Sequence, residues 1–222
     1  MQYRPSTQEY SQDVARQDSQ RVLRNTYLLL SMTLLFSAVT AGISMAMGIR
    51  HINILLFILG TYGSMFWVYK TSDSAMGLVA TFVFTGFMGF TLGPILSGVA
   101  SLPGGSQTIV TALAMTGFAF AGLSAIAIVT RKDFNFLSSF IMVGALVLIA
   151  AMVISLFLPT PGFVMAISAG FVLLASATIL FKTSQLVRGE EMNYIEATIS
   201  LYVSLYNMFV SLLNLLSMSS RD

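Results

Sequence analysis

Long apolar stretches alternate with short polar segments along this chain, a pattern that predicts helices crossing a membrane. In a helix, about 20 apolar residues span a hydrocarbon core of about 30 Å. We identify seven stretches of suitable length: Asn25–Gly48, Ile52–Tyr69, Ala75–Ala100, Gln107–Val129, Leu137–Leu158, Gly162–Phe181 and Tyr194–Met218. The segments between them are short, so consecutive helices are expected to run antiparallel. The predicted fold is all-α, with seven transmembrane helices.

The composition also indicates a membrane protein. Hydrophobic residues make up 56% of the 222 residues and charged residues only 9%, against about 25% charged in a typical soluble protein. A soluble domain is excluded because its surface would lack polar groups, so the lipid bilayer is the expected surrounding. The net charge of +2 comes without a run of Lys and Arg, so we expect no nucleic-acid partner.

The placement of the basic residues predicts the orientation in the membrane. Of the 11 Lys and Arg residues, two, Arg50 and Arg221, fall on one side, and all the others fall on the side of the N-terminus. Basic residues are enriched in cytoplasmic loops. The N-terminus is therefore predicted to be cytoplasmic and, after seven spans, the C-terminus to lie outside.

The start of the chain differs from the rest. Residues 1–23 are polar and rich in Gln and Ser, a composition that predicts a disordered cytoplasmic tail. Residues 24–222 form the predicted seven-helix transmembrane domain. An ordinary frayed terminus is the alternative to a tail with a function.

Glycines in the third apolar stretch predict close helix packing. Small residues let membrane helices approach one another, and Gly86, Gly89 and Gly93 are spaced to do so. The Gly93–Pro94 pair is expected to kink or break the same helix, because proline lacks a backbone N–H.

Polar residues recur along one side of the last stretch, and we call them the polar seam. They are Ser200, Ser204, Asn207, Ser211 and Asn214, at spacings of 4, 3, 4 and 3. Polar side chains are costly against lipid, so this helix is expected to be central, surrounded by the other six. The seam could border a water-filled cavity or hydrogen-bond directly to neighbouring helices, and the sequence leaves both open.

The charged residues before the last stretch indicate capping rather than catalysis. Asn193 and Glu196 have the spacing of a capping box. The chain has no cysteine, its one histidine is His51, and it lacks the HExxH, GxSxG and GxxxxGK[ST] patterns. We therefore expect no enzymatic activity, no metal site and no cofactor.

Several segments have a recognisable sequence. They are LRNTYLLLSMTLLFSAVTA at 23–41, TGFMGFTLGPIL at 85–96, TRKDFNFL at 130–137, and NYIEATISLYVSLYNMFVSLLN at 193–214, which includes LYVSLYN at 201–207. In these segments the chain resembles the Bax inhibitor family of membrane proteins, and within it the bacterial branch that modulates the FtsH membrane protease. The resemblance covers residues 21–222.

The resemblance implies both a fold and a function. The fold has six helices around the last one. The function is that of a bacterial inner-membrane protein that binds the FtsH protease complex and restrains its degradation of membrane substrates. The tail, up to residue 20, would then be a cytoplasmic handle for the protease, and the C-terminus would be periplasmic. An ion or proton leak along the polar seam is the alternative function.

Two positions set this chain apart from other members of the family. Some members are associated with a calcium or proton leak controlled by two aspartates, and the matching positions here are Lys182 and Ser204. A carboxylate pair titrates and binds Ca²⁺ through its oxygens, whereas lysine and serine do neither in the same way. We therefore do not extend the calcium role to this chain.

Overall fold

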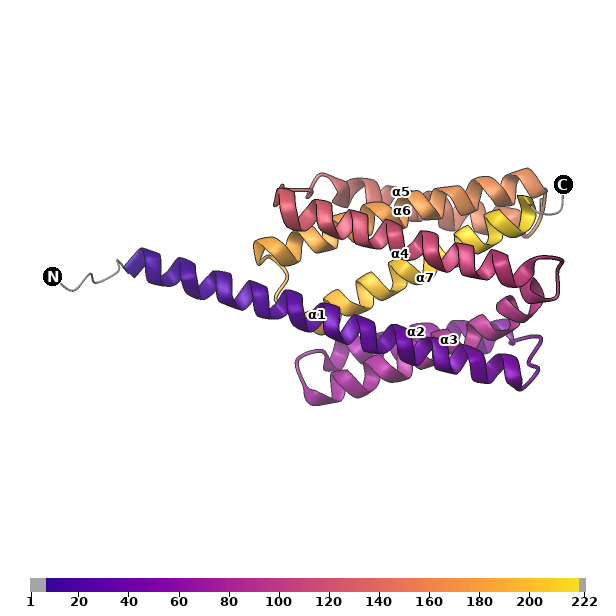
Figure 1. Cartoon of the computed structure of the whole chain (residues 1–222), viewed down its shortest axis with the longest axis horizontal. Coiled ribbons are helices and arrows are strands. Elements are labelled where there is room, and N and C mark those ends of the chain that lie inside the picture. The colour runs from indigo at the N-terminus through magenta and orange to yellow at the C-terminus, as the bar shows by residue number, and fades with distance from the viewer. Residues whose placement is uncertain (1–6, 220–222) are drawn as a thin grey trace.

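The structure, a computed structural model, describes residues 7–219 and consists of helices joined by short turns (Figure 1). The helices are α1 (Thr7–Ala46), α2 (Ile54–Thr71), α3 (Ala75–Ala100), α4 (Gly105–Thr130), α5 (Leu137–Ser155), α6 (Pro161–Arg188) and α7 (Tyr194–Ser219). Each of the seven contains a segment long and apolar enough to cross a membrane. The prediction of an all-α, seven-span membrane protein is confirmed.

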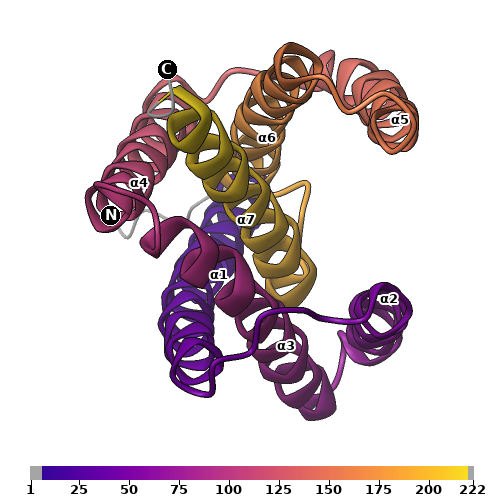
Figure 2. The same cartoon turned by 90° about the vertical axis from the view of Figure 1, so that its right-hand side faces the viewer.

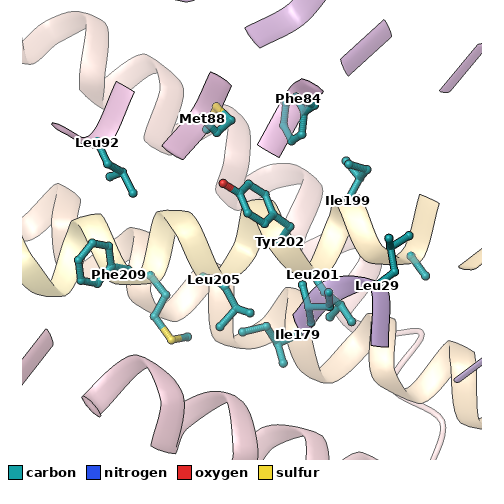
Figure 3. Close-up of a cluster of buried hydrophobic side chains, with 14 of the residues drawn as sticks. Leu29, Phe84, Met88, Leu92, Ile179, Ile199, Leu201, Tyr202, Leu205 and Phe209 are labelled. Atoms are coloured by element: carbon teal, nitrogen blue, oxygen red, sulfur yellow. The ribbon is translucent and has the colours of Figure 1, made fainter. Parts of the chain in front are cut away.

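Helix α7 is the central helix of the bundle (Figure 2). It packs against α1, α2, α3, α4 and α6, and half of its most apolar segment is buried. Figure 3 shows its side chains in the core between those of neighbouring helices. The core residues labelled there are Leu29, Phe84, Met88, Leu92, Ile179, Ile199, Leu201, Tyr202, Leu205 and Phe209.

Helix α5 departs from the expected ring of six helices around α7. Within residues 7–219 it packs against α6 alone, and none of its residues is buried. The contact with α6 depends on small residues on both helices. A Cβ atom added at Gly144 would lie 2.9 Å from Leu174, and one added at Gly170 would lie 2.6 Å from Leu148. Five helices therefore contact α7, and α5 is a peripheral sixth.

Helices α1 and α3 approach closely at the glycines of α3. A Cβ atom at Gly86 would lie 2.6 Å from the ring of Phe36, and one at Gly89 would overlap the backbone carbonyl of Ser37. A Cβ atom at Gly93 would overlap the hydroxyl of Ser44. Any larger side chain at these positions would push the two helices apart.

The first helix is longer than the sequence predicts. It begins at Thr7 and has 40 residues, a length of about 60 Å at 1.5 Å per residue. A hydrocarbon core takes up only about half of that, and Figure 1 shows the N-terminal part of α1 reaching beyond the other helices. Most of the tail predicted to be disordered is thus helical, because it continues a helix that the membrane segment has already nucleated. Residues 1–6 of that tail lie outside the described residues, and the division at residue 23 stays a prediction.

Proline 94 does not break α3. The helix runs without interruption from Ala75 to Ala100, with Pro94 inside it. Membrane helices tolerate an internal proline because neighbouring groups compensate for the lost backbone hydrogen bond. Of the expected kink or break, the break is therefore wrong, and the kink stays a prediction.

Glycine and proline mark the ends of several helices. Gly104 before α4 has φ 70° and Gly189 after α6 has φ 73°, values that residues with a Cβ atom rarely adopt. Pro161 is the first residue of α6. A backbone N–H at this position would have no hydrogen-bond partner within the helix, so proline loses no bond there. Gly189 turns the chain between α6 and α7, which pack side by side.

Candidate functional site

A cavity of about 230 Å³ lies beside the half of the polar seam nearer the start of α7. Ser200, Ser204 and Asn207 form its polar side. The remaining lining residues come from α2, α5, α6 and α7, and most of them are apolar: Met65, Tyr69, Ile141, Ala145, Phe171, Leu174, Ala175, Thr178 and Val203. The cavity therefore places polar groups of the central helix against an otherwise apolar wall.

The polar groups in this cavity are only partly satisfied by the protein. The Ser204 hydroxyl donates to the backbone carbonyl of Ser200, 2.8 Å away. Among the described residues, neither the Asn207 carboxamide nor the Ser200 hydroxyl has a hydrogen-bond partner. Both groups are available to something that enters the cavity.

The other half of the seam contacts protein directly. The Asn214 amide nitrogen donates to the Ser168 hydroxyl of α6 at 3.2 Å, and Ser211 is buried. The two alternatives that the sequence leaves open therefore each describe part of the seam. The first half borders the cavity of about 230 Å³. The second half contributes an interhelical hydrogen bond through Asn214, which also lines a separate cavity of about 410 Å³.

Helix α7 also carries a second polar stripe, which the hydropathy pattern does not predict. It consists of Tyr194, Thr198, Tyr202 and Tyr206, which recur every four residues. The Tyr202 hydroxyl donates to the backbone carbonyl of Thr85 on α3 (3.2 Å) and is hydrogen-bonded to the Ser37 hydroxyl of α1 (2.7 Å). This spacing signals a shared helix face, but tyrosine counts as hydrophobic in a hydropathy pattern.

Two more bonds of this stripe join α7 to its neighbours. The Thr198 hydroxyl donates to the backbone carbonyl of Thr26 on α1 at 3.3 Å. The Tyr206 and Thr91 hydroxyls lie 3.4 Å apart. Helix α7 is thus hydrogen-bonded to α1 and α3 through this stripe, and to α6 through the seam.

The start of α7 is capped, but the partners differ from those of a capping box. The Asn193 side-chain oxygen accepts hydrogen bonds from the backbone N–H groups of Ile195 (3.0 Å) and Glu196 (3.2 Å). The reciprocal bond expected from Glu196 is made by Glu191, whose carboxylate accepts from the Asn193 N–H at 3.2 Å. Glu196 instead accepts from the Ser72 hydroxyl at 2.9 Å. It is drawn away because the turn between α2 and α3 lies beside the start of α7.

The two positions that match the family's aspartates do not form a pair. Lys182 forms an ion pair with Glu191, 3.2 Å away, and the Ser204 hydroxyl is bonded to the backbone of its own helix. Within the described part of the chain, no group of three or more acidic or histidine side chains could hold a metal ion. Lys182 therefore links the end of α6 to the α6–α7 turn through an ion pair.

A second ionic cluster ties the α4–α5 turn to the end of α6. The Arg188 guanidinium lies 2.8 Å from the Asp133 carboxylate and 2.8 Å from that of Glu190. The hydrogen bond from Arg188 lowers the pKa of Asp133 below its usual value. Since α5 has few contacts of its own, this cluster helps to hold the turn that leads into it.

Comparison with known proteins identifies relatives along nearly the whole chain. Residues 19–221 match the family described as "Inhibitor of apoptosis-promoting Bax1". An uncharacterized protein of Pseudomonas aeruginosa is 51% identical over 201 residues, which is 90% of each chain. The Escherichia coli K12 protein named "Modulator of FtsH protease YccA" is 48% identical over 202 residues, 91% of this chain and 92% of the relative. A membrane protein of Vibrio cholerae is 46% identical over 206 residues, 92% of each chain.

Proposed function

This chain belongs to the Bax inhibitor family, and we propose that it modulates the FtsH protease in the bacterial inner membrane. The observation that carries the proposal is the 48% identity to the E. coli modulator of FtsH over 91% of this chain. A protein of another E. coli strain, also 48% identical over 202 residues, is named "Inner membrane protein YccA". An identity of this size over nearly the whole of both chains supports a shared fold.

The proposed role is regulatory rather than enzymatic. The protein binds the FtsH complex and restrains its degradation of membrane substrates. Its cytoplasmic turns are short, and the N-terminal part of α1 is the longest segment that leaves the bundle. With the N-terminus in the cytoplasm, the part of α1 that begins at Thr7 extends toward a protease that works on that side, and the C-terminus is periplasmic.

Two measurements on native membranes test this function. FtsH is expected to co-purify with the tagged full-length protein. The half-life of a membrane substrate of FtsH is expected to lengthen when the protein is overproduced and to shorten when its gene is deleted. Absence of co-purification together with an unchanged half-life would refute the proposal.

An ion or proton leak is the second candidate function. It is favoured by one observation, the cavity that exposes Ser200, Ser204 and Asn207 beside the central helix. In liposomes containing the purified protein, Ser204→Leu and Asn207→Leu are expected to lower ion flux. Flux equal to that of the wild type in both variants would eliminate this candidate.

A further inference from the structure

The cavity beside the polar seam is lined by both α2 and α5. Helix α5 packs against α6 alone, and α2 packs against α3 and α7, so within residues 7–219 the two helices do not touch. Figure 2 shows them standing apart on the same side of α7. Met65 and Tyr69 of α2 and Ile141 and Ala145 of α5 line the cavity between them. We call this cavity the α2–α5 groove.

The two helices that flank the groove are also the least buried of the membrane segments. None of the residues of α5 is buried, and in α2 only Val68 is. The most apolar segments of the other five helices are 22% to 50% buried. Because both helices beside the groove are poorly buried, this face of the bundle is not packed against other helices of the chain.

The floor of this groove carries an unsatisfied amide at mid-membrane depth. Asn207 lies at the middle of α7 (Tyr194–Ser219), and its carboxamide has two donor hydrogens and an acceptor oxygen. No described residue bonds to it. An amide without partners is costly in hydrocarbon. An acyl chain can fill the space but offers no hydrogen bond, whereas a polar side chain on another membrane helix can supply one.

We propose that the α2–α5 groove binds a transmembrane helix of the FtsH complex that carries a hydrogen-bonding side chain near its middle. This inference rests on the proposed function for the identity of the partner. The partner helix lies between α2 and α5 and bonds to Asn207. Ala145 and Ala175 on the cavity wall are small enough to allow it to approach. The backbone of the partner helix requires no hydrogen bond from the groove, because a helix satisfies its own backbone groups in lipid.

Photocrosslinking in native membranes tests the groove. A photoreactive amino acid is placed in the full-length protein at Met65 or Ile141, which line the groove, or at Phe118 on α4. Phe118 is 80% exposed, and α4 lies on the other side of α7 in Figure 2. Crosslinks to FtsH or a partner subunit are expected from the first two positions and not from Phe118.

Two asparagines on α7 provide a matched pair of variants. Asn207→Leu is expected to lower crosslinking from the groove by about threefold to tenfold, the effect of one interhelical hydrogen bond. Asn214→Leu is the control, because Asn214 already bonds to Ser168, and it is expected to leave crosslinking unchanged. Asn207→Gln keeps the amide and is expected to restore part of the signal, which separates loss of the bond from misfolding.

The possible failures are distinguishable. Crosslinks to FtsH from Phe118, but not from the groove, would overturn the groove and leave the proposed function standing. Crosslinks from the groove positions to lipid alone would likewise overturn the groove and leave the proposed function standing. If Asn207→Leu and Asn214→Leu changed crosslinking from the groove equally, the proposed role of the Asn207 amide would be overturned. No crosslink to FtsH from any position, with an unchanged substrate half-life, would refute both proposals.

Discussion

Gly89→Ala is expected to destabilise the protein by forcing α1 away from α3. The added Cβ atom would overlap the backbone carbonyl of Ser37 and lie 2.6 Å from the Ser37 hydroxyl. Ordinary contacts of this kind are 3.4–4 Å, so the helices would have to separate by about 1 Å. A backbone carbonyl cannot rotate away as a flexible side chain could. The separation also stretches the 2.7 Å hydrogen bond between Ser37 and Tyr202.

Three contributions set the size of this effect. Overpacking in a tightly packed contact costs about 1–3 kcal/mol, and a weakened interhelical hydrogen bond costs about 0.6 kcal/mol. Alanine in place of glycine stabilises a helix by up to about 1 kcal/mol in water. The expected net loss is about 2 kcal/mol, which raises the unfolding equilibrium constant about 30-fold.

The assay is equilibrium unfolding by SDS in mixed micelles, followed by far-UV circular dichroism. Gly98→Ala in the same helix is the control, because a Cβ atom at Gly98 meets nothing within 4 Å. This control is expected to be as stable as the wild type or slightly more stable. Equal stability of the two variants would refute the reasoning, since both gain the same methyl group and only one gains a clash.

Three further predictions concern other parts of the molecule. Tyr202→Phe removes the hydroxyl bonded to Ser37 and should cost about 1 kcal/mol in the same SDS titration. Arg188 lowers the pKa of Asp133, so their contact stabilises the fold at neutral pH and loses this effect as the pH falls through the lowered pKa. The stability difference between wild type and Asp133→Asn should therefore vanish in acid. Deleting residues 1–20 should spare the circular dichroism spectrum of the bundle but lengthen the protein's lifetime in pulse-chase experiments, and unchanged turnover would contradict a handle role.

The main features of the fold could be predicted because they depend on local sequence. Each apolar stretch is long enough to cross a bilayer by itself, so the number and approximate ends of the spans follow from the chain alone. The central place of α7 follows from polar side chains on a membrane helix, which need to face protein. The glycines of α3 likewise indicate close packing, but nothing in their spacing identifies α1 as the helix that approaches them.

The missing features depend on contacts between distant segments. The peripheral place of α5 is not visible in its sequence, because a helix facing lipid and a helix facing other apolar helices have the same composition. Glu196 has the right spacing to cap its own helix, but its carboxylate accepts a hydrogen bond from Ser72, which is far away in the chain. The bonds of Tyr202 could not be predicted because its partners lie on two other helices. The spacing of the seam indicates a shared face but not which of its side chains bonds to a neighbouring helix.

The position of the central helix in the chain has a consequence for biosynthesis. Helix α7 follows the other six described helices in the chain, so they are made before it, and translation is slow compared with the formation of a single helix. The first six helices therefore stand in the membrane without the segment that fills the space between them. During that interval the carbonyls of Thr26 and Thr85, which later accept from Thr198 and Tyr202, lack these partners. A chain stopped before residue 194 would therefore lack the helix against which five of the other six pack.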